Sequence, residues 1–278
     1  MRILVPIKQV PETNAVRMDE TTGTMVREGV EAIVNPLDLY AVETALRLKE
    51  AQGGEVIVLT MGPAGAAKAL REAISMGCDG AVLISHKAFA GSDTWATARV
   101  LAEAVRKIGA FDLILCGERA TDGDTGQVGP ELAAFLDLPV VSYVGAIDGV
   151  SVAGGARCPQ RAESTGTIRV RRLVEEGHEL LECDLPAVLT VVKEIADPRL
   201  PTLQGKRRAR LASIPAWGPE ELGVAAEEVG LMGSPTRVVK VFRPKIARRC
   251  EKLAADDEAG IEAATDRLVA FLKEKVLL

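Results

Sequence analysis

The sequence predicts an α/β protein with a Rossmann-like open parallel sheet. Three observations predict this fold class: short apolar runs that are nearly continuous, helical patterns between these runs, and a change of rhythm past residue 140. Near-continuous apolar runs are typical of parallel strands, because such strands are covered on both faces. Alternation of strands with helices then places helices on each face of the sheet.

The expected parallel strands are short runs rich in β-branched residues and leucine. Because parallel strands share one direction, the turns that follow them should meet at one edge of the sheet. The runs are residues 2–7 (RILVPI), 55–60 (EVIVLT), 81–85 (AVLIS) and 112–116 (DLILC).

Helices are expected between these strands, and the first has the clearest start. Asn35 is a good N-cap, Pro36 fits the first helical turn, and the acid Asp38 complements the free amides of a helix start. Glycine follows or ends each pattern, as is common at helix ends. The three helices are expected over residues 35–54, 63–77 and 92–109, the last capped by Ser92 or Asp93.

The pattern past residue 140 predicts strands joined by short turns. We interpret these strands as an antiparallel addition to the edge of the sheet. They cover residues 140–147, 167–174, 178–183 and 187–192.

The last third of the chain predicts an arm followed by a helix. Proline, glycine and basic residues dominate from Lys193, and its stretch GKRRAR (205–210) is expected to be a solvated basic surface. The end, residues 260–278, predicts an amphipathic helix with Ile261, Leu268 and Leu272 facing inward. We therefore expect an α/β domain at 1–192, which the later motifs mark as the nucleotide- or flavin-binding part, and a partner-contacting region at 193–278. The alternative is that arm and helix wrap their own domain.

Composition excludes several function classes. The 278 residues carry a net charge of −5 and only 3% aromatic residues, which argues against nucleic-acid binding. Five cysteines without a CxxC spacing and two histidines support neither a disulfide framework nor a metal site. The apolar run at the start is too short for a signal peptide, and no run approaches the roughly 18 residues of a membrane span. We expect a soluble, cytoplasmic protein.

A candidate ligand site follows from the turns after three of the strands. These turns are PIKQVPET, MGPAG and GERATDGDTG. Gly62 and Gly117 allow the backbone to approach a ligand closely, and a helix starting near Thr125 offers free amides for a phosphate. Thr121, Thr125 and Gln127 are neutral donors, while Asp122 or Asp124 would cap the turn or accept ribose hydroxyls. The alternative is a plain glycine-rich loop.

The missing motifs narrow the chemistry. The sequence has no GxxxxGK[ST] P-loop, and KQVPET rather than GxGxxG follows the first strand. No Ser-His-Asp or Cys-His arrangement is visible, and His86 and His178 are expected to be structural or solvated. Chemistry at this site would have to come from a cofactor, so no catalytic side chain is expected.

The motifs taken together resemble the beta subunit of electron transfer flavoproteins, the ETF beta/FixA family, over nearly the whole length. The resemblance rests on KQVPET, on GV…NPLDLYAVETALRLKE, on VLTMGP and REAISMGCDGAVLIS, on DLILCGERATDGDTGQVGPELA, and on VRRLVEEGHELLECDLPAVLTVVKE. It implies an adenine-nucleotide-binding α/β domain of the HUP-like kind. It also implies a heterodimer with an ETF alpha subunit that holds an FAD.

The resemblance leaves two types open. In the electron-bifurcating type the beta site holds a second FAD, which accepts a hydride from NADH and sends electrons to the alpha-subunit FAD with its acyl-CoA dehydrogenase and to ferredoxin or flavodoxin. In the common type the site holds AMP, and the carrier delivers electrons from acyl-CoA dehydrogenases to a quinone reductase. DGDTGQVGPE and SPTRVVKVFRPKI (234–246) resemble the bifurcating type, although Gly126 and Glu118 depart from its usual loop. A non-redox nucleotide-binding regulatory domain is the alternative from another class.

The resemblance also implies which residues bind. Ile195, in VVKEIADPRL, falls at the apolar anchor of the family's docking loop for acyl-CoA dehydrogenases. Pro6, Asn35, Asp38 and Met61 should line the adenosine and ribose, and Thr94 should join the cofactor site. The pyrophosphate should be wrapped by Gly117, Glu118, Arg119, Ala120, Thr121, Asp122, Gly123, Asp124, Thr125, Gly126, Gln127 and Val128.

Overall fold

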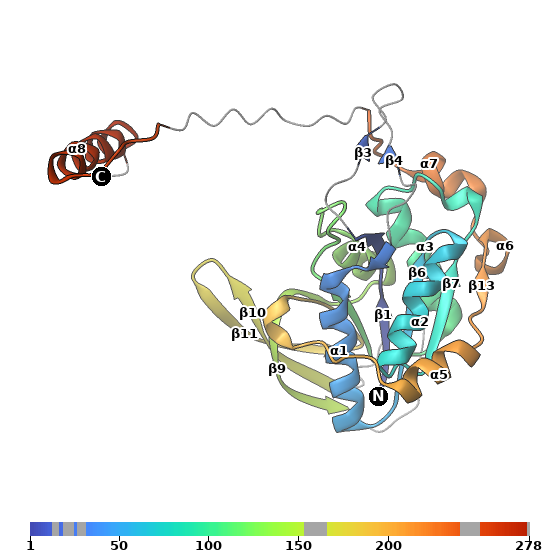
Figure 1. Cartoon of the computed structure of the whole chain (residues 1–278). Coiled ribbons are helices and arrows are strands. Elements are labelled where there is room, and N and C mark those ends of the chain that lie inside the picture. The colour runs from blue at the N-terminus through green and yellow to red at the C-terminus, as the bar shows by residue number, and fades with distance from the viewer. Residues whose placement is uncertain (13–16, 19–24, 27–31, 153–165, 240–250, 277–278) are drawn as a thin grey trace. The chain divides into compact units, whose positions relative to one another are not determined.

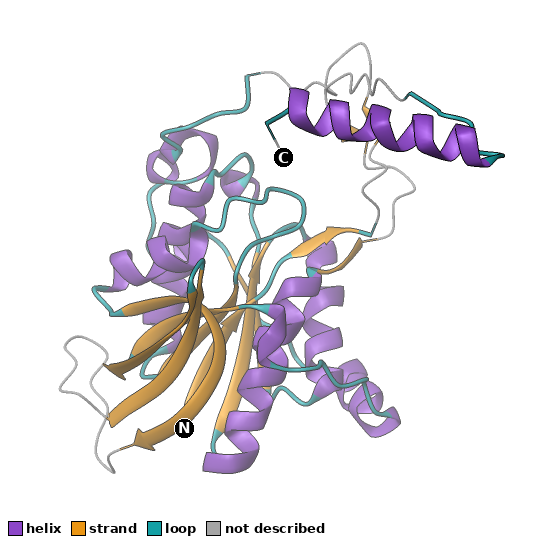
Figure 2. Cartoon of the chain, turned by 90° about the vertical axis from the view of Figure 1, so that its left-hand side faces the viewer, coloured by secondary structure: helices purple, strands orange, loops and turns teal. Residues whose placement is uncertain are grey.

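The computed structural model describes residues 1–12, 17–18, 25–26, 32–152, 166–239 and 251–276. The chain divides into two compact units, Met1–Val239 and Lys240–Leu278. In the first unit, a nine-stranded sheet has helices on both faces (Figures 1 and 2). In the second, the described structure is helix α8, Glu258–Glu274.

The sheet confirms the predicted α/β fold class. Its strand order is β11-β10-β9-β12-β8-β1-β6-β7-β13, and the neighbours from β9 through β12, β8, β1, β6 and β7 to β13 run parallel. Four of these strands lie where the apolar runs predicted them. The strands are β1 Arg2–Pro6, β6 Glu55–Met61, β7 Gly80–Ile84, β8 Leu113–Gly117, β9 Val140–Val152, β10 Gly166–Val174, β11 Gly177–Leu185, β12 Ala187–Val191 and β13 Ala216–Trp217.

The antiparallel addition is present, but one strand expected in it lies elsewhere. Strands β9, β10 and β11 pair antiparallel at one edge of the sheet. Strand β12, at residues 187–191, instead runs parallel between β8 and β9, so its assignment to the antiparallel addition was wrong. All five residues of β12 are buried, as a strand covered on both faces requires, whereas β10 alternates between buried and exposed positions.

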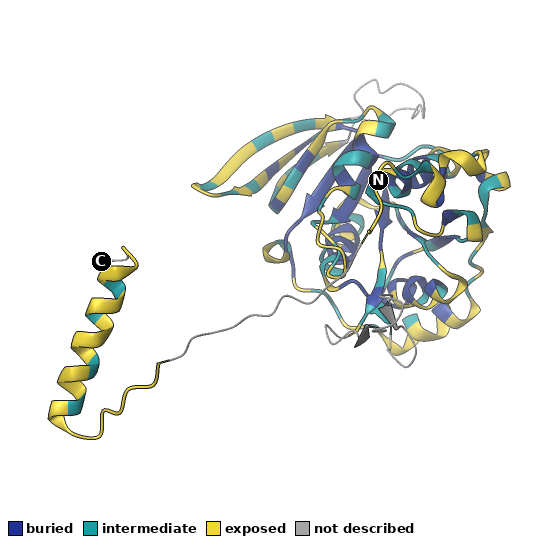
Figure 3. Cartoon of the chain, turned by 90° about the horizontal axis from the view of Figure 1, so that it is seen from above, coloured by how far each residue is buried: buried dark blue, intermediate teal, exposed yellow. Residues whose placement is uncertain are grey.

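Helices cover the two faces of the sheet and create two cores. Ile3 and Val5 of β1 pack in the cluster that includes α1 and α2, while Leu4 packs in the cluster that includes α3 and α4. This alternation reflects the two-residue period of a strand. Figure 3 shows the buried strands at the centre of the first unit. The helices of the unit are α1 Pro36–Gln52, α2 Ala67–Met76, α3 Thr94–Ile108, α4 Val128–Leu136, α5 Leu203–Leu211, α6 Pro219–Leu222 and α7 Gly230–Gly233.

The segment expected as an extended arm contains helix α5, which packs against α2. Arg208 donates from Nη2 to the carbonyls of Ile74 and Cys78, at 2.8 and 2.9 Å, at the end of α2. A Cβ at Gly205 would lie 2.0 Å from the Ser75 carbonyl oxygen, so only glycine fits this contact. The basic stretch 205–210 is therefore partly a structural element of the first unit, although most of its charged side chains are exposed.

Smaller elements complete the described chain. Strands β2 Gln9–Pro11 and β5 Ala32–Val34 pair antiparallel, as do β3 Arg17–Met18 and β4 Met25–Val26. The expected C-terminal helix is present as α8, where Ile261 and Leu268 are each more than half exposed. No described helix combines the length and the apolar character that crossing a bilayer would require.

Candidate functional site

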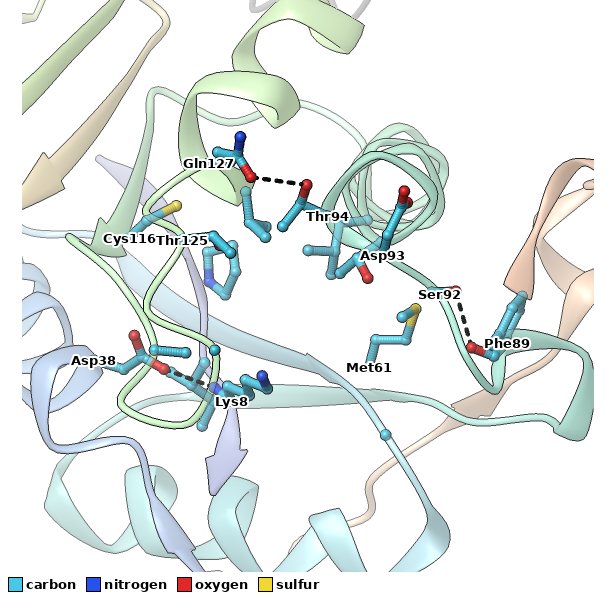
Figure 4. Close-up of a pocket in the computed structure, with 18 of the residues that line it drawn as sticks. Lys8, Asp38, Met61, Phe89, Ser92, Asp93, Thr94, Cys116, Thr125 and Gln127 are labelled. Atoms are coloured by element: carbon cyan, nitrogen blue, oxygen red, sulfur yellow. Dashed lines mark hydrogen bonds between the residues drawn. The ribbon is translucent and has the colours of Figure 1, made fainter. Parts of the chain in front are cut away.

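A cavity of about 950 Å³ lies at the carboxyl ends of the central strands (Figure 4). Pro6, Met61 and Gly117 line it, and they are the last residues of β1, β6 and β8. The strands around it all run parallel, in the order β12-β8-β1-β6-β7. The chain adds β6 and β7 on one side of β1 and then β8 and β12 on its other side, so the switch point lies between β1 and β8. Open α/β sheets bind their ligands at such a switch point, outside the carboxyl ends of the strands. The cavity is therefore the candidate binding site.

Asn35 organises the loop that follows β8. It is fully buried, its Nδ2 donates to the carbonyl of Arg119 at 2.9 Å, and the backbone N–H of Thr121 donates to its Oδ1 at 3.1 Å. Asn35 occupies the N-cap position of α1, as expected, but its side chain makes no cap hydrogen bond. The side chain is hydrogen-bonded to the loop instead. Asn35 therefore supports the loop from the side away from the cavity and is not among the cavity-lining residues.

Asp38 is a buried carboxylate between β1 and the same loop. Its Oδ2 accepts from the backbone N–H of Lys8 at 2.7 Å, and a Cβ at Gly117 would lie 2.4 Å from its Oδ1. Burial raises the pKa of Asp38 to about 7, although the hydrogen bonds from Lys8 and Asn35 oppose this rise. The carboxyl group therefore changes charge near neutral pH.

The loop acids pair with cations. Lys8 Nζ lies 2.7 Å from Asp122 Oδ1, and Arg119 Nε lies 3.2 Å from Asp124 Oδ1 and 3.3 Å from Glu118 Oε1. Each of these three acids of the loop therefore has a cation beside it that offsets its negative charge. The ion pairs also hold the loop at two further points, in addition to the Asn35 hydrogen bonds.

The helix after the loop begins later than expected, at Val128 rather than near Thr125. Asp124 and Gly126 have φ of 55° and 66°, and this left-handed backbone delays the helix. Across the cavity, α3 begins at Thr94 and is capped by Asp93, whose Oδ1 accepts from Ala96 N at 3.0 Å. Two helix starts, each with a positive dipole end, thus meet at one cavity.

Most of the predicted binding residues line this cavity. The exceptions are Asn35, Thr121, Asp122 and Asp124, which lie in the loop or behind it. The cavity-lining residues among the predicted set are Pro6, Asp38, Met61, Thr94, Gly117, Glu118, Arg119, Ala120, Gly123, Thr125, Gly126, Gln127 and Val128.

Sequence reasoning missed several lining residues. Lys8 begins KQVPET, two residues after the end of β1. Its position just beyond the carboxyl end of a predicted strand could have identified it as a lining residue. His86, Ser92 and Cys116 also line the cavity. Burial raises the pKa of the Cys116 thiol, which keeps it protonated, and His86 Nδ1 accepts from Ala88 N at 3.1 Å. Within the described ranges no group of three metal-ligating side chains occurs.

The expected docking residue lies apart from this cavity. Ile195 is half-buried and packs against the core cluster that includes α1, whereas Leu200 and Leu203 are 86% and 79% exposed. Segment 234–246 is described only to Val239, and the rest lies outside the described residues. In its described part, the N–H and Oγ1 of Thr236 donate to Asp93 Oδ2, at 2.9 and 2.8 Å.

Comparison with known proteins supplies the family. The electron transfer flavoprotein domain matches residues 22–221. The chain is 43% identical over 279 residues to the caffeyl-CoA reductase-Etf complex subunit CarD of Acetobacterium woodii, with 100% of both chains covered. It is 42% identical over 270 residues to the electron transfer flavoprotein subunit beta of Thermoanaerobacterium thermosaccharolyticum, covering 96% of this chain and 98% of the relative.

A third relative is protein FixA of Azorhizobium caulinodans, 41% identical over 275 residues, with 97% of this chain and 93% of the relative covered. The chain belongs to the electron transfer flavoprotein family, among its beta subunits and FixA proteins.

Proposed function

We propose that this chain is an electron-transferring beta subunit whose cavity binds FAD. The observation that carries the proposal is the cavity of about 950 Å³ at the switch point, lined by the loop after β8 and by two helix starts. Ligand cavities span about 300–1,000 Å³, so this one suits a ligand of dinucleotide size. AMP would occupy only part of it.

The start of α4 supports pyrophosphate binding, because Val128 and Gly129 of its first turn line the cavity. A Cβ at Gly117 would clash with Asp38, and one at Gly129 would lie 2.6 Å from Thr190 Cγ2, so both glycines allow close backbone packing at the cavity wall. Free backbone N–H groups at the start of a helix favour phosphate oxygens. We propose that the cavity-lining residues of the loop 117–128 hold the pyrophosphate, that Pro6, Asp38 and Met61 line the adenosine side, and that Thr94 contacts the cofactor. Asn35 supports the loop from behind.

The chain's own residues bind and orient, and they need no acid or base step. FAD, when bound, supplies the redox chemistry, including acceptance of a hydride from NADH. Lys8 and Arg119 offset the charge of the loop acids, at 2.7 Å from Asp122 and 3.2 Å from Asp124, so that the acids oppose an anionic ligand less.

We propose the electron-bifurcating type over the AMP type. The similarity to CarD, a subunit of a caffeyl-CoA reductase-Etf complex, supports this choice, as does the loop DGDTGQVGPE. In this role the chain would pass electrons to an FAD on an ETF alpha subunit and to a low-potential acceptor such as ferredoxin or flavodoxin.

Two surfaces of the chain would serve partners. The segment 193–203 carries half-buried Ile195 together with the exposed leucines 200 and 203, and would dock an acyl-CoA dehydrogenase or a similar flavoenzyme. Helix α8 has no buried residue, and Ile261 and Leu268 are exposed on it. Most helical stability in proteins comes from packing of an apolar face, so we propose that α8 packs on the alpha subunit.

Counting flavins tests the proposal. The chain is produced together with its alpha subunit, and bound nucleotides are released by denaturation and quantified. About two flavins per heterodimer, with rapid bleaching of the flavin absorbance by NADH, are expected. One flavin and one tightly bound AMP per heterodimer would contradict the bifurcating role and would indicate the AMP type. A stable monomer that never carries flavin would favour a regulatory nucleotide-binding domain.

A further inference from the structure

Arg199 joins the segment after β12 to helix α1. Its Nε lies 2.7 Å from Glu43 Oε2, and its Nη2 lies 3.1 Å from Glu43 Oε1. The backbone N–H of Arg199 donates to Glu43 Oε2 as well, at 3.2 Å. The guanidinium also donates to both carboxylate oxygens of Glu50, about two turns further along α1, with Nη2 at 3.0 Å from Oε2. One arginine therefore bridges two carboxylates on one face of the helix.

Glu43 is the buried centre of this group of charges. Its side chain is only 3% exposed, and its Oε1 also accepts from Arg47 Nε at 2.8 Å. Arg47 in turn donates from Nη2 to the carbonyl of Asp197 at 3.3 Å. Burial raises the pKa of Glu43, but the hydrogen bonds from Arg199 and Arg47 lower it by more, so the carboxyl group stays ionised. Glu43, Arg47, Glu50 and Arg199 thus form a charge-balanced set, the Arg199 cluster.

The segment that the Arg199 cluster holds has no regular secondary structure. Residues 196–201 lie between the 3₁₀ turn Lys193–Ile195 and Thr202, the N-cap of α5. Within the described part of the chain, the hydrogen bonds of these six residues go to the side chains of the cluster. Pro198 and Pro201 fix their own φ and favour extended backbone in the residue before them. Stiff backbone and side-chain hydrogen bonds together therefore set the course of this segment.

The segment carries exposed apolar side chains. Leu200 follows Arg199 directly, Leu203 begins α5, and both are exposed. Desolvation offsets much of the attraction within a buried ion pair, so net stability alone does not explain the cluster. A segment that is ordered before binding loses less entropy when a partner docks. The Arg199 cluster preorganises the backbone on which the two leucines are displayed.

We propose that Glu43 and Arg199 are positioning residues for partner docking, whose ion pair holds the segment on α1 so that Leu200 and Leu203 meet an acyl-CoA dehydrogenase in a preset arrangement. The inference rests on the proposed function, because it takes the docking segment as it is proposed there. Neither residue lines the nucleotide cavity, so the role is separate from cofactor binding.

The test measures electron exchange between the complex with its alpha subunit and a butyryl-CoA dehydrogenase. Butyryl-CoA reduces a catalytic amount of the dehydrogenase, and flavin reduction in the complex is followed at a series of complex concentrations. Arg199→Ala should raise the KM for the complex about tenfold and keep kcat within about twofold, because the segment must then be ordered during docking. Arg199→Lys keeps the charge but loses the bidentate contacts, so an increase of about threefold is expected.

Arg106→Ala is the matched control. Arg106 also joins a helix glutamate, Glu103, to a distant carbonyl, that of Phe135, but it does so on α3. It should change neither KM nor kcat. Glu43→Gln should raise KM as Arg199→Ala does. If this buried substitution prevents folding, Arg199→Ala carries the test, because the arginine side chain is partly exposed.

Two further measurements separate positioning from structural support. Hydrogen exchange followed by mass spectrometry should show amides of residues 196–201 exchanging about tenfold faster in Arg199→Ala, with the strands of the sheet unchanged. The KM increase in the double variant Arg199→Ala/Leu200→Ala should be smaller than the product of the two single increases, because Arg199 acts through the leucine. A purely structural role would lower the unfolding free energy and leave KM unchanged.

Three results would overturn the inference alone: an unchanged KM in Arg199→Ala while Leu200→Ala raises it, unchanged exchange at residues 196–201, or multiplicative increases in the double variant. If neither Leu200→Ala nor Leu203→Ala raises KM, the proposed docking segment is wrong instead. A parent complex without flavin would remove the proposed function, and this is seen before any variant is made. Circular dichroism checks the fold of every variant.

Discussion

The backbone N–H of Thr121 donates to the side-chain oxygen of Asn35, which precedes it by 86 residues in the chain, at 3.1 Å. The other half of the same amide donates to the Arg119 carbonyl at 2.9 Å. One buried side chain therefore satisfies a donor and an acceptor of the loop after β8 and ties that loop to the start of α1. The loop residues that line the cavity are held in part by this link.

Asn35→Ala should therefore destabilise the protein and weaken nucleotide binding together. The substitution leaves the Thr121 N–H and the Arg119 carbonyl without their partner, and each such group costs about 1–3 kcal/mol when buried. Urea unfolding gives the free energy, and ADP titration gives the affinity. Gln204→Ala removes an exposed amide from α5 and is the control. An Asn35→Ala variant with parental stability and affinity would contradict this role.

Gly117→Ala should destabilise the protein, because the added Cβ would lie 2.4 Å from Asp38 Oδ1 and 2.9 Å from the Leu37 carbonyl oxygen. Overpacking of this kind costs about 1–3 kcal/mol. Gly123→Ala, in the same loop, meets no atom within 4 Å and should leave the unfolding free energy nearly unchanged. Thermal unfolding of the two variants in parallel measures their stabilities. Equal losses of stability in Gly117→Ala and Gly123→Ala would disprove the close approach at Gly117.

Asp38 should make folding stability fall as the pH rises. Burial raises its pKa from 3.8 to about 7, so the folded state holds this proton more tightly than the unfolded state. The contribution is fully present below about pH 4 and is lost as the pH rises through about 7. Asp38→Asn keeps an acceptor for the Lys8 N–H but cannot ionise. Urea unfolding from pH 4 to 8 should therefore show a steeper decline in the parent than in Asp38→Asn, and parallel curves would refute the assignment.

Substitutions in the proposed docking segment, residues 193–203, should affect folding stability and partner binding differently. Ile195→Ala removes half-buried apolar surface and should cost about 1 kcal/mol of unfolding free energy. Leu203→Ala removes an exposed side chain, so the free energy of unfolding should change by less than about 0.5 kcal/mol. Electron exchange between the complex and an acyl-CoA dehydrogenase should become slower in this variant. Leu211→Ala, 88% exposed on the same helix, is the control for both measurements. Slower transfer in the control but not in Leu203→Ala would reject the proposed surface.

The sequence allowed the parallel part of the fold to be predicted because its signals are local. The apolar runs at 2–7, 55–60, 81–85 and 112–116 correspond to β1, β6, β7 and β8. Caps such as Asp93 marked helix starts. The place of β12 in the sheet and the formation of α5 were missed, because both depend on contacts with distant segments. Arg208, for example, is hydrogen-bonded to carbonyls 134 and 130 residues away.

The same limit applies to the site. The sequence and the family resemblance together allowed the loop after β8 and its glycines to be predicted as binding residues. Most of those residues line the cavity. The ion pair of Glu43 with Arg199 could not be predicted, because only the folded chain brings these residues, 156 positions apart, to 2.7 Å. Nor could the pattern show that Asn35 turns its side chain away from its own helix and toward the loop.

The left-handed residues Asp124 and Gly126, the Asn35 hydrogen bonds and the Lys8–Asp122 ion pair have a shared consequence for association kinetics. The loop has a defined conformation in the chain by itself, so few backbone torsions remain to be frozen when a nucleotide enters. Preorganised sites lose less entropy on binding than loops that fold around their ligand. Nucleotide entry should therefore follow a single concentration-dependent phase, without a slow rearrangement after encounter.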